Sequence, residues 1–329
     1  MMKIAFFDAK EYEIPYFDRY GREEGVGFHY FETPLNGETA PLARGFDGVC
    51  LFVNDRLDAA AIDRLTECGV QVAALRCAGS NNVDLAHAKG RLRVVHVPAY
   101  SPHAVAEHAA GMLLTSVRRI HKAYNRTREF NFSLQGLIGF ELHGKTAGVV
   151  GMGRIGSAFA EICRGFGMRV LAYDPAPRAL SEAEYCPIDR LFAESDVLSF
   201  HCPLTEHTRH LLCTRTLPLL KKGVMIVNTS RGGLIDSEAL LEGIKSRRIG
   251  GACLDVYEEE EGLFFEDNSG HILEDDTLAR LISMPNVLVT SHQAFLTKEA
   301  LDAIALTTVS NLISLFERGS CENELIFRG

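Results

Sequence analysis

Three apolar segments in the C-terminal half of the 329-residue sequence are each followed by side chains that acid–base chemistry uses. Arg231 follows segment 224–228, an acidic run follows 250–254, and His292 follows 287–290. The planar fork of an arginine suits a carboxylate. A histidine titrates near neutral pH and can protonate a carbonyl oxygen as it becomes an alkoxide. This combination indicates hydride transfer to C2 of a small 2-keto acid.

The acidic run offers a third group, a carboxylate that would hold the histidine ring in orientation. It contains Glu258, Glu259, Glu260 and Glu261. The residues alone do not choose among the four, and part of the run is typical of a solvated acidic turn.

A glycine-rich turn predicts a dinucleotide site. Gly151, Gly153 and Gly156 form GxGxxG directly after the apolar segment 146–150, and the next apolar segment ends in Asp174. In this context the glycines permit a tight turn, a close approach of the pyrophosphate and close packing of helix on strand. The free N–H groups of the helix N-terminus attract phosphate. Because Asp174 would accept a ribose 2′-hydroxyl and repel a 2′-phosphate, NAD is favoured over NADP.

Apolar segments that alternate with helical stretches predict a parallel α/β fold. Six strands are expected in the second part of the chain, at 146–150, 169–173, 197–200, 224–228, 250–254 and 287–290. Six parallel strands complete a doubly wound Rossmann sheet, whose ligands bind at the carboxyl ends of the strands.

The first hundred residues predict a smaller, flavodoxin-like parallel α/β domain, with strands at 3–7, 49–53, 72–77 and 94–97 and a helix at 58–68. Prolines at 98 and 102 break the pattern before one helix from Ala104 to Phe130. A last helix, 296–318, has no remaining strand to join and is expected to pack on the first domain. We therefore predict a discontinuous substrate domain, 1–100 with 297–329, and an NAD-binding domain, 101–296.

Composition excludes several classes of function. The nine cysteines are scattered and form no CxxC pair, so buried thiols are favoured over disulfides or a metal site. The net charge of -9 disfavours nucleic acid as a partner. No apolar run reaches the length of a signal peptide or a membrane span, which predicts a cytoplasmic protein without membrane contact.

Motifs along almost the whole chain resemble the D-2-hydroxyacid dehydrogenase family, particularly its bacterial fermentative, lactate-forming branch. They are RCAGSNNVDL, VPAYSPHAVAEHAAG, GKTAGVVGMGRIG, HCPLTEHT, VMIVNTSRGGLID, DVYEEEEGLFFED and SHQAFLT. The resemblance implies Arg231, Glu260 and His292 as the catalytic residues, and it selects Glu260 from the acidic run.

The resemblance also implies the contacts around the two ligands. Substrate contacts fall on Ala78, Gly79, Tyr100, Arg231, His292 and Phe295. Cofactor contacts fall on Gly151, Gly153, Arg154, Ile155, Gly156, Asp174, Cys202, Pro203, Thr208, Thr229, Ser230, Arg231 and Asp255. One departure is at 52–55, where some lactate-type members carry a tyrosine and this chain has Phe-Val-Asn-Asp.

The implied activity is reversible, NADH-dependent reduction of pyruvate to D-lactate. Larger 2-keto acids such as phenylpyruvate are an alternative, and an NAD-sensing, corepressor-like binding protein is a second one from another class. The family implies a homodimer or homotetramer, and the AAGMLL stretch of the long helix is an apolar face suited to a partner. Whether Arg76, His96, His103 or His201 reaches the cleft stays open.

Overall fold

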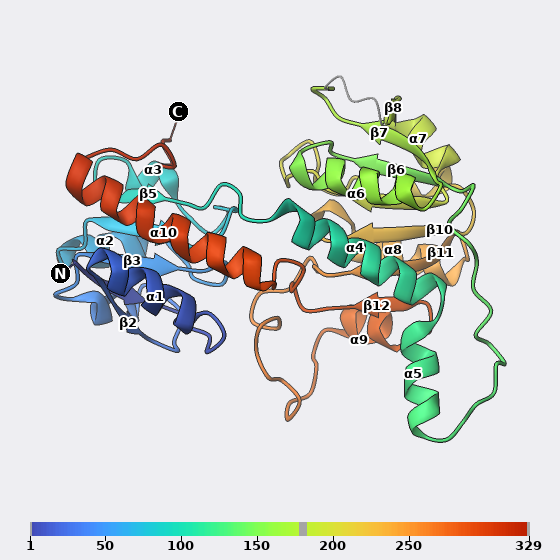
Figure 1. Cartoon of the computed structure of the whole chain (residues 1–329), viewed down its shortest axis with the longest axis horizontal. Helices are drawn as coiled ribbons and strands as arrows, with labels where there is room; N and C mark the ends of the chain where they lie inside the picture. The colour runs from blue at the N-terminus through green and yellow to red at the C-terminus, as the bar shows by residue number, and fades with distance from the viewer. Residues whose placement is uncertain (1, 178–182, 328–329) are drawn as a thin grey trace. The chain divides into compact units, whose positions relative to one another are not determined.

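The computed structural model describes residues 2–177 and 183–327, which form two compact units (Figure 1). The first unit combines Met1–Ser101 with Leu296–Gly329, and the second is Pro102–Phe295. Each boundary lies one residue from the predicted one.

The first unit contains one parallel five-stranded sheet of order β2-β1-β3-β4-β5. Its strands are β1 (Met2–Phe6), β2 (Val26–Tyr30), β3 (Gly48–Leu51), β4 (Val72–Leu75) and β5 (Arg93–Val95), and its helices are α1 (Ile14–Glu24), α2 (Ala59–Glu67), α3 (Leu85–Ala88) and α10 (Lys298–Arg318). The order is that of flavodoxin-like folds, in which the connections reverse direction between β1 and β3.

Strand β2 and helix α1 were missing from the prediction. Strand β2 reads VGFHY and has only its first residue fully buried, because it is an edge strand. It therefore lacks the continuous apolar run that marks a central parallel strand.

Helix α10 is long and apolar enough to cross a membrane by length and composition, so the prediction that no segment reaches that length was wrong. Its apolar side packs in the first unit, where α10 lies against α1 and β4. Ala300, Ile304, Val309 and Leu312 are buried there. The same composition that suits a membrane thus serves the core of this unit.

The second unit contains a parallel seven-stranded sheet of order β12-β11-β10-β9-β6-β7-β8. The strands are β6 (Thr146–Val150), β7 (Arg169–Tyr173), β8 (Glu184–Tyr185), β9 (Val197–Phe200), β10 (Val224–Asn228), β11 (Ile249–Leu254) and β12 (Val287–Val289). The six predicted strands are all present. The seventh, β8, has two residues beside β7 and carries no periodicity that a sequence could reveal.

Helices cover both faces of this sheet. They are α4 (Pro102–Val117), α5 (Ile120–Arg128), α6 (Arg154–Gly165), α7 (Ile188–Glu194), α8 (Ser237–Lys245) and α9 (Asp276–Ser283). Neighbouring residues of a strand enter opposite cores: Val149 and Val227 pack with α4 and α6, whereas Val150 and Ile226 pack with α7, α8 and α9. Burial on both faces explains why the strands are continuous apolar runs.

The single long helix predicted from Ala104 to Phe130 was wrong. The structure breaks it into α4 and α5 at Arg119, whose φ of 55° is left-handed. Within α4, Ala109, Met112 and Leu113 are buried in the core of their own unit. The AAGMLL stretch is therefore not a free face for a partner.

Candidate active site

The glycine turn has the geometry that a pyrophosphate site needs. Gly151 has φ 92°, a conformation that L side chains rarely adopt. A Cβ at Gly156 would lie 1.9 Å from the carbonyl oxygen of Gly151, so helix α6 can approach β6 only because this residue is glycine. A Cβ at Gly153 would meet nothing within 4 Å, which leaves the N-terminus of α6 open to a ligand. The residues present therefore fit the dinucleotide.

Asp174 lies at the end of β7 and holds the same turn. Its carboxylate accepts hydrogen bonds from the backbone N–H of Met152 at 2.8 Å and of Ala176 at 2.8 Å. These bonds orient a negative charge beside the glycine turn, where it opposes a 2′-phosphate.

The other predicted cofactor residues lie at carboxyl ends of neighbouring strands. Arg154 and Ile155 open α6, Cys202 and Pro203 follow β9, Thr229 and Ser230 follow β10, and Asp255 follows β11. The Ser230 hydroxyl donates to the Cys202 carbonyl at 2.8 Å, which ties the β9 and β10 ends together. The Thr208 hydroxyl donates to the Pro203 carbonyl at 2.7 Å and closes the loop that follows β9. Contact of these residues with the cofactor stays a prediction.

Arg231 is held by a braced turn. The Asn228 side chain donates to the carbonyl of Arg231 at 2.9 Å and accepts from the N–H of Ser230 at 3.1 Å. A Cβ at Gly232 would lie 2.0 Å from the Tyr257 carbonyl, so the arginine turn and the turn after β11 touch through their backbones.

His292 and Glu260 form a hydrogen-bonded pair at the same edge of the sheet. Nδ1 of His292 lies 2.9 Å from Oε1 of Glu260, and the other carboxylate oxygen accepts from the N–H of Tyr257 at 3.0 Å. Because Nδ1 faces a carboxylate it carries a proton, and Nε2 is the ring nitrogen left for a substrate. Both side chains keep partial exposure, 16% for His292 and 23% for Glu260.

The rest of the acidic run has other partners. Glu258 pairs with His210 at 2.5 Å and with Arg209 at 3.2 Å, and Glu259 and Glu261 are exposed. The geometry thus brings Glu260 alone among the four glutamates to the histidine.

The aromatic ring of Phe265 also lies beside His292, with ring centroids 5.7 Å apart. Phe265 has φ 69°, a strained conformation for a bulky residue, which places this ring by the imidazole. A turn that begins at Glu260 therefore supplies both a carboxylate and an aromatic neighbour to the same histidine.

The buried carboxylate of Asp255 positions the residues after β12. It accepts from the N–H groups of Gln293 at 2.9 Å and Ala294 at 2.8 Å and from the Thr290 hydroxyl at 2.6 Å. His108 of α4 lies 3.4 Å away. Burial raises the pKa of Asp255, but hydrogen bonds from His108, Thr290 and the two amides outweigh burial, and the net pKa is lowered.

The other predicted substrate contacts belong to the first unit or to the end of the second unit. In the first unit, Ala78 accepts from Nδ1 of His96 at 3.0 Å, and Cys77 donates to the Gly79 carbonyl at 3.3 Å. Tyr100, also in that unit, is half-buried. Phe295 closes the second unit and is 8% exposed.

Two further histidines that were candidates for the cleft, His201 and His103, differ in their burial and contacts. The ring of His201 lies 5.0 Å from that of Phe159 and 2.8 Å from the Ser199 hydroxyl. Burial lowers the pKa of His201 to about 3, so it is neutral and structural. His103 is exposed.

Sequence reasoning missed Asn228, His108, Phe265 and the bracing role of Asp255. The signal available for Asn228 was an amide at the end of an otherwise apolar strand, which predicts a turn brace. No local signal could have paired His108 with Asp255, because 147 positions separate them.

Comparison with known proteins places this geometry in a family. Residues 110–294 match the family described as D-isomer specific 2-hydroxyacid dehydrogenase, NAD binding domain. The D-lactate dehydrogenase of Escherichia coli (strain K12) is 51% identical over 329 residues, which cover 99% of this chain and 100% of that protein.

Solved structures of D-lactate dehydrogenases are similar to this chain over nearly its whole length. The apo structure of D-lactate dehydrogenase from Escherichia coli has a TM-score of 0.91 at 49% identity, and the match covers 99% of this chain and 100% of that one. D-lactate dehydrogenase with NAD+ from Lactobacillus jensenii has a TM-score of 0.82 at 30% identity and the same coverage. The predicted two-domain α/β fold and the predicted NAD cofactor are confirmed.

The open space at Gly153 predicts a selective loss of cofactor affinity in Gly153→Ala. The added methyl group meets no atom of the described residues, so the melting temperature should be unchanged, but it would obstruct the pyrophosphate and raise the Kd for NADH at least about tenfold. Gly165→Ala, at the other end of α6 and equally uncrowded, is the matched control and should leave the Kd unchanged. Equal affinities of the two variants would contradict this account.

The lowered pKa of Asp255 predicts a pH-dependent cost for Asp255→Asn. A depressed native pKa stabilises the fold above the unfolded value of about 3.9, and this contribution disappears as the pH falls through the native pKa. Urea unfolding at pH 7 should show a loss of about 2 kcal/mol against the unaltered protein. The difference in the free energy of unfolding between the two proteins should become smaller near pH 3. A difference of constant size would show that the ionised carboxylate of Asp255 does not stabilise the fold.

Proposed function

Because the chain belongs to the D-isomer specific 2-hydroxyacid dehydrogenases, which are NAD-dependent oxidoreductases, we propose that it reduces pyruvate to D-lactate and catalyses the reverse reaction. Identity of 51% with a D-lactate dehydrogenase over the whole chain supports pyruvate as the substrate. The observation that carries the mechanism is the His292–Glu260 pair, 2.9 Å apart, at the strand edge that also presents Arg231.

The three side chains have separate roles in this proposal. Bound NADH supplies the hydride that C2 of pyruvate accepts. Arg231 binds the substrate carboxylate through its guanidinium group and so fixes the direction of the carbonyl.

Proton transfer falls to His292. As C2 is reduced, Nε2 gives its proton to the carbonyl oxygen, and the alcohol forms without a free alkoxide. Glu260 accepts the Nδ1–H bond throughout, which keeps the ring oriented and stabilises the imidazolium before transfer. In lactate oxidation the same nitrogen takes the hydroxyl proton.

A substrate panel with a histidine variant tests the function. The unaltered protein should oxidise NADH with pyruvate at a higher kcat/KM than with phenylpyruvate, and should prefer NADH to NADPH because of Asp174. His292→Gln should lower kcat by about 10²- to 10⁴-fold, since it removes the proton donor. Its Kd for NADH, measured by fluorescence titration, should stay within about twofold.

Each rival predicts a different result. Preference for phenylpyruvate would identify a dehydrogenase for larger 2-keto acids. NADH binding without turnover of either acid would identify an NAD-sensing binding protein, which the intact set Arg231, Glu260 and His292 disfavours. Undiminished turnover by His292→Gln would refute its role as the proton donor.

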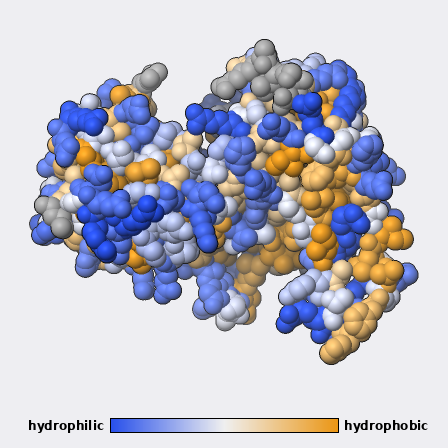
Figure 2. Space-filling model, in the orientation of Figure 1, coloured by the Kyte–Doolittle hydropathy of each residue, from blue (hydrophilic) through white to orange (hydrophobic). Residues whose placement is uncertain are grey.

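We also propose that the protein is a homo-oligomer, a dimer or a tetramer, that associates through α5 and the segment after it. Apolar side chains gather there on the surface of the second unit (Figure 2). They are Ile120, Tyr124, Phe130, Phe132, Leu134 and Ile138, with exposures of 52%, 58%, 84%, 71%, 79% and 89%. A patch of this kind is typical of a protein interface.

The oligomer is tested by placing a charge in this patch. Ile138→Asp should shift the mass measured by sedimentation towards the monomer, because the charge would be buried without a partner. Ile272→Asp replaces an equally exposed isoleucine (91%) elsewhere in the unit and should leave the mass unchanged. A monomeric unaltered protein, or an unchanged mass for Ile138→Asp, would exclude this interface.

We further propose a cytoplasmic location. Among the described residues none of the nine cysteines forms a disulfide, which suits a reducing compartment.

A further inference from the structure

Arg76 occupies the position in the first unit where a ligand would bind in other folds of this order. The connections reverse direction between β1 and β3, and the carboxyl ends of these strands border a crevice in flavodoxin-like sheets. Arg76 comes directly after β4, is 1% exposed and lies between two rings, 4.2 Å from the centroid of Phe6 and 4.9 Å from that of Phe52. The guanidinium group therefore lies among the loops at the carboxyl ends of these strands.

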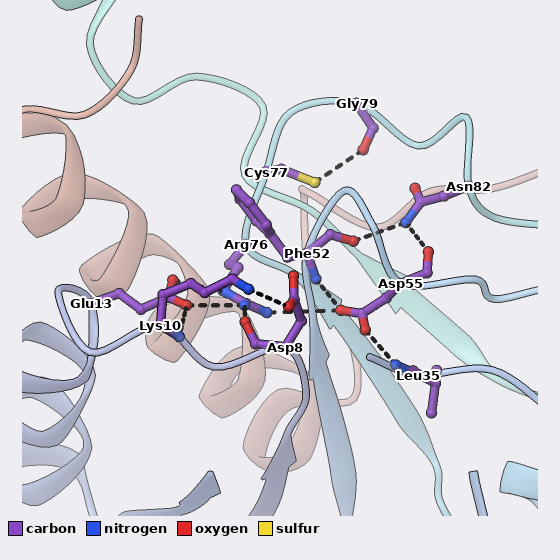
Figure 3. Close-up of polar contacts among 10 residues, drawn as sticks. All are labelled: Asp8, Lys10, Glu13, Leu35, Phe52, Asp55, Arg76, Cys77, Gly79 and Asn82. Carbon is purple, nitrogen blue, oxygen red and sulfur yellow. Dashed lines mark hydrogen bonds and ion pairs between the residues drawn. The ribbon is translucent and has the colours of Figure 1, made fainter. Parts of the chain in front are cut away.

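The guanidinium group binds the loop after β1 (Figure 3). Its Nε and Nη2 donate to the Glu13 carboxylate at 2.9 and 3.0 Å, and Nη2 also donates to the carbonyl of Asp8 at 2.7 Å. Burial pulls the pKa of Arg76 down, but the Glu13 carboxylate outweighs it and the net pKa is raised. The group is therefore a permanent charge.

On its other side the guanidinium group meets the loop after β3. Nη1 lies 4.0 Å from Oδ2 of Asp55, and the Asp55 carboxylate accepts from the N–H groups of Leu35 and Phe52, both at 2.5 Å. Asn82, beyond β4, donates to the carbonyls of Phe52 at 2.9 Å and Asp55 at 2.7 Å. The loops after β1, β3 and β4 are thus joined through one side chain and its immediate partners.

Stability alone does not require this arrangement, since apolar side chains of similar volume often replace a buried ion network without loss of stability. What a guanidinium fork adds is direction, because its donors fix several acceptors in one plane. The segment that directly continues from Arg76 is the turn 77–79, which contains Ala78 and Gly79, the two residues predicted to bind the substrate carboxylate.

We propose that Arg76 is a positioning residue for the substrate: it orients the turn 77–79 for the carboxylate of the 2-keto acid and does not itself touch substrate. This inference rests on the proposed function. A displaced turn loses an interaction that is made equally in the ground and transition states, and such a loss raises KM. Arg76 therefore governs the KM for the keto acid, whereas NADH affinity depends on the glycine turn of the other unit.

The test is Arg76→Lys, which keeps the charge and removes the fork. We expect the KM for pyruvate to rise at least about tenfold, with kcat changed less than threefold, because the contact is made equally in the ground and transition states. The Kd for NADH should not change. Arg93→Lys is the matched control. Arg93 makes a two-bonded pair with Glu324 at the start of β5, whereas Arg76 lies at the opposite, carboxyl end of the strands, and the KM of the Arg93→Lys variant should stay at the unaltered value.

Asn82→Ala keeps the inference testable if Arg76→Lys does not fold. It frees the turn without burying an unpaired charge and should raise KM in the same direction by a smaller factor. A folded Arg76→Lys with KM within twofold of the unaltered protein, or Asn82→Ala with an unchanged KM, would overturn the positioning role. If the unaltered protein reduces phenylpyruvate and not pyruvate, the proposal that pyruvate is the substrate is wrong. The ratio of the KM of Arg76→Lys to that of the unaltered protein, measured with phenylpyruvate, then still tests the role of Arg76.

Discussion

The reaction geometry depends on where one fully buried carboxylate, that of Asp255, holds the residues after β12. His292 has a left-handed backbone with φ 53°, and its N–H donates to the Asp255 carbonyl at 2.6 Å. The next two N–H groups point at the Asp255 carboxylate. A non-glycine residue keeps such a conformation only where its surroundings determine it. The chain therefore turns sharply at His292 and aims its imidazole along the edge of the sheet, towards Glu260.

The first unit uses the same principle with the opposite charge. Arg76 lies buried directly after β4, and Asp255 lies buried directly after β11. Arg76 donates to the backbone carbonyl of Asp8. Asp255 accepts from the backbone N–H of Ala294, so each of the two residues binds a loop that is distant from it in the sequence. Parallel strands deliver their loops to one edge of a sheet but do not fix the loops' orientation. A buried ion with several hydrogen bonds supplies that orientation, because leaving any of its partners unpaired costs free energy.

The sequence predicted the parts that local pattern determines and missed those that depend on distant contacts. Of the six strands predicted in the second unit, all except the edge strand β12 are interior strands. They are continuous apolar runs because they are buried on both faces, and the glycine turn is a local backbone requirement. Edge strands β2 and β8 lack such runs. The break at Arg119 was missed because the residues around it have ordinary helix propensity. The choice of Glu260 needed either resemblance or coordinates, since it depends on Arg209 and His210 engaging Glu258 from another loop.

The ionisable groups discussed above differ in burial. Some are fully buried and serve as fixed supports, and others keep contact with solvent. Asp255 and Arg76 are sealed from water and surrounded by partners that favour their charged forms, so they stay ionised and serve as fixed supports. Burial of the His201 ring lowers its pKa to about 3, so this histidine stays neutral. His292 and Glu260 form a pair in which both side chains keep partial exposure. A histidine that must give a proton in one direction of the reaction and take it in the other has to exchange that proton with solvent, and the structure leaves this exchange open at His292.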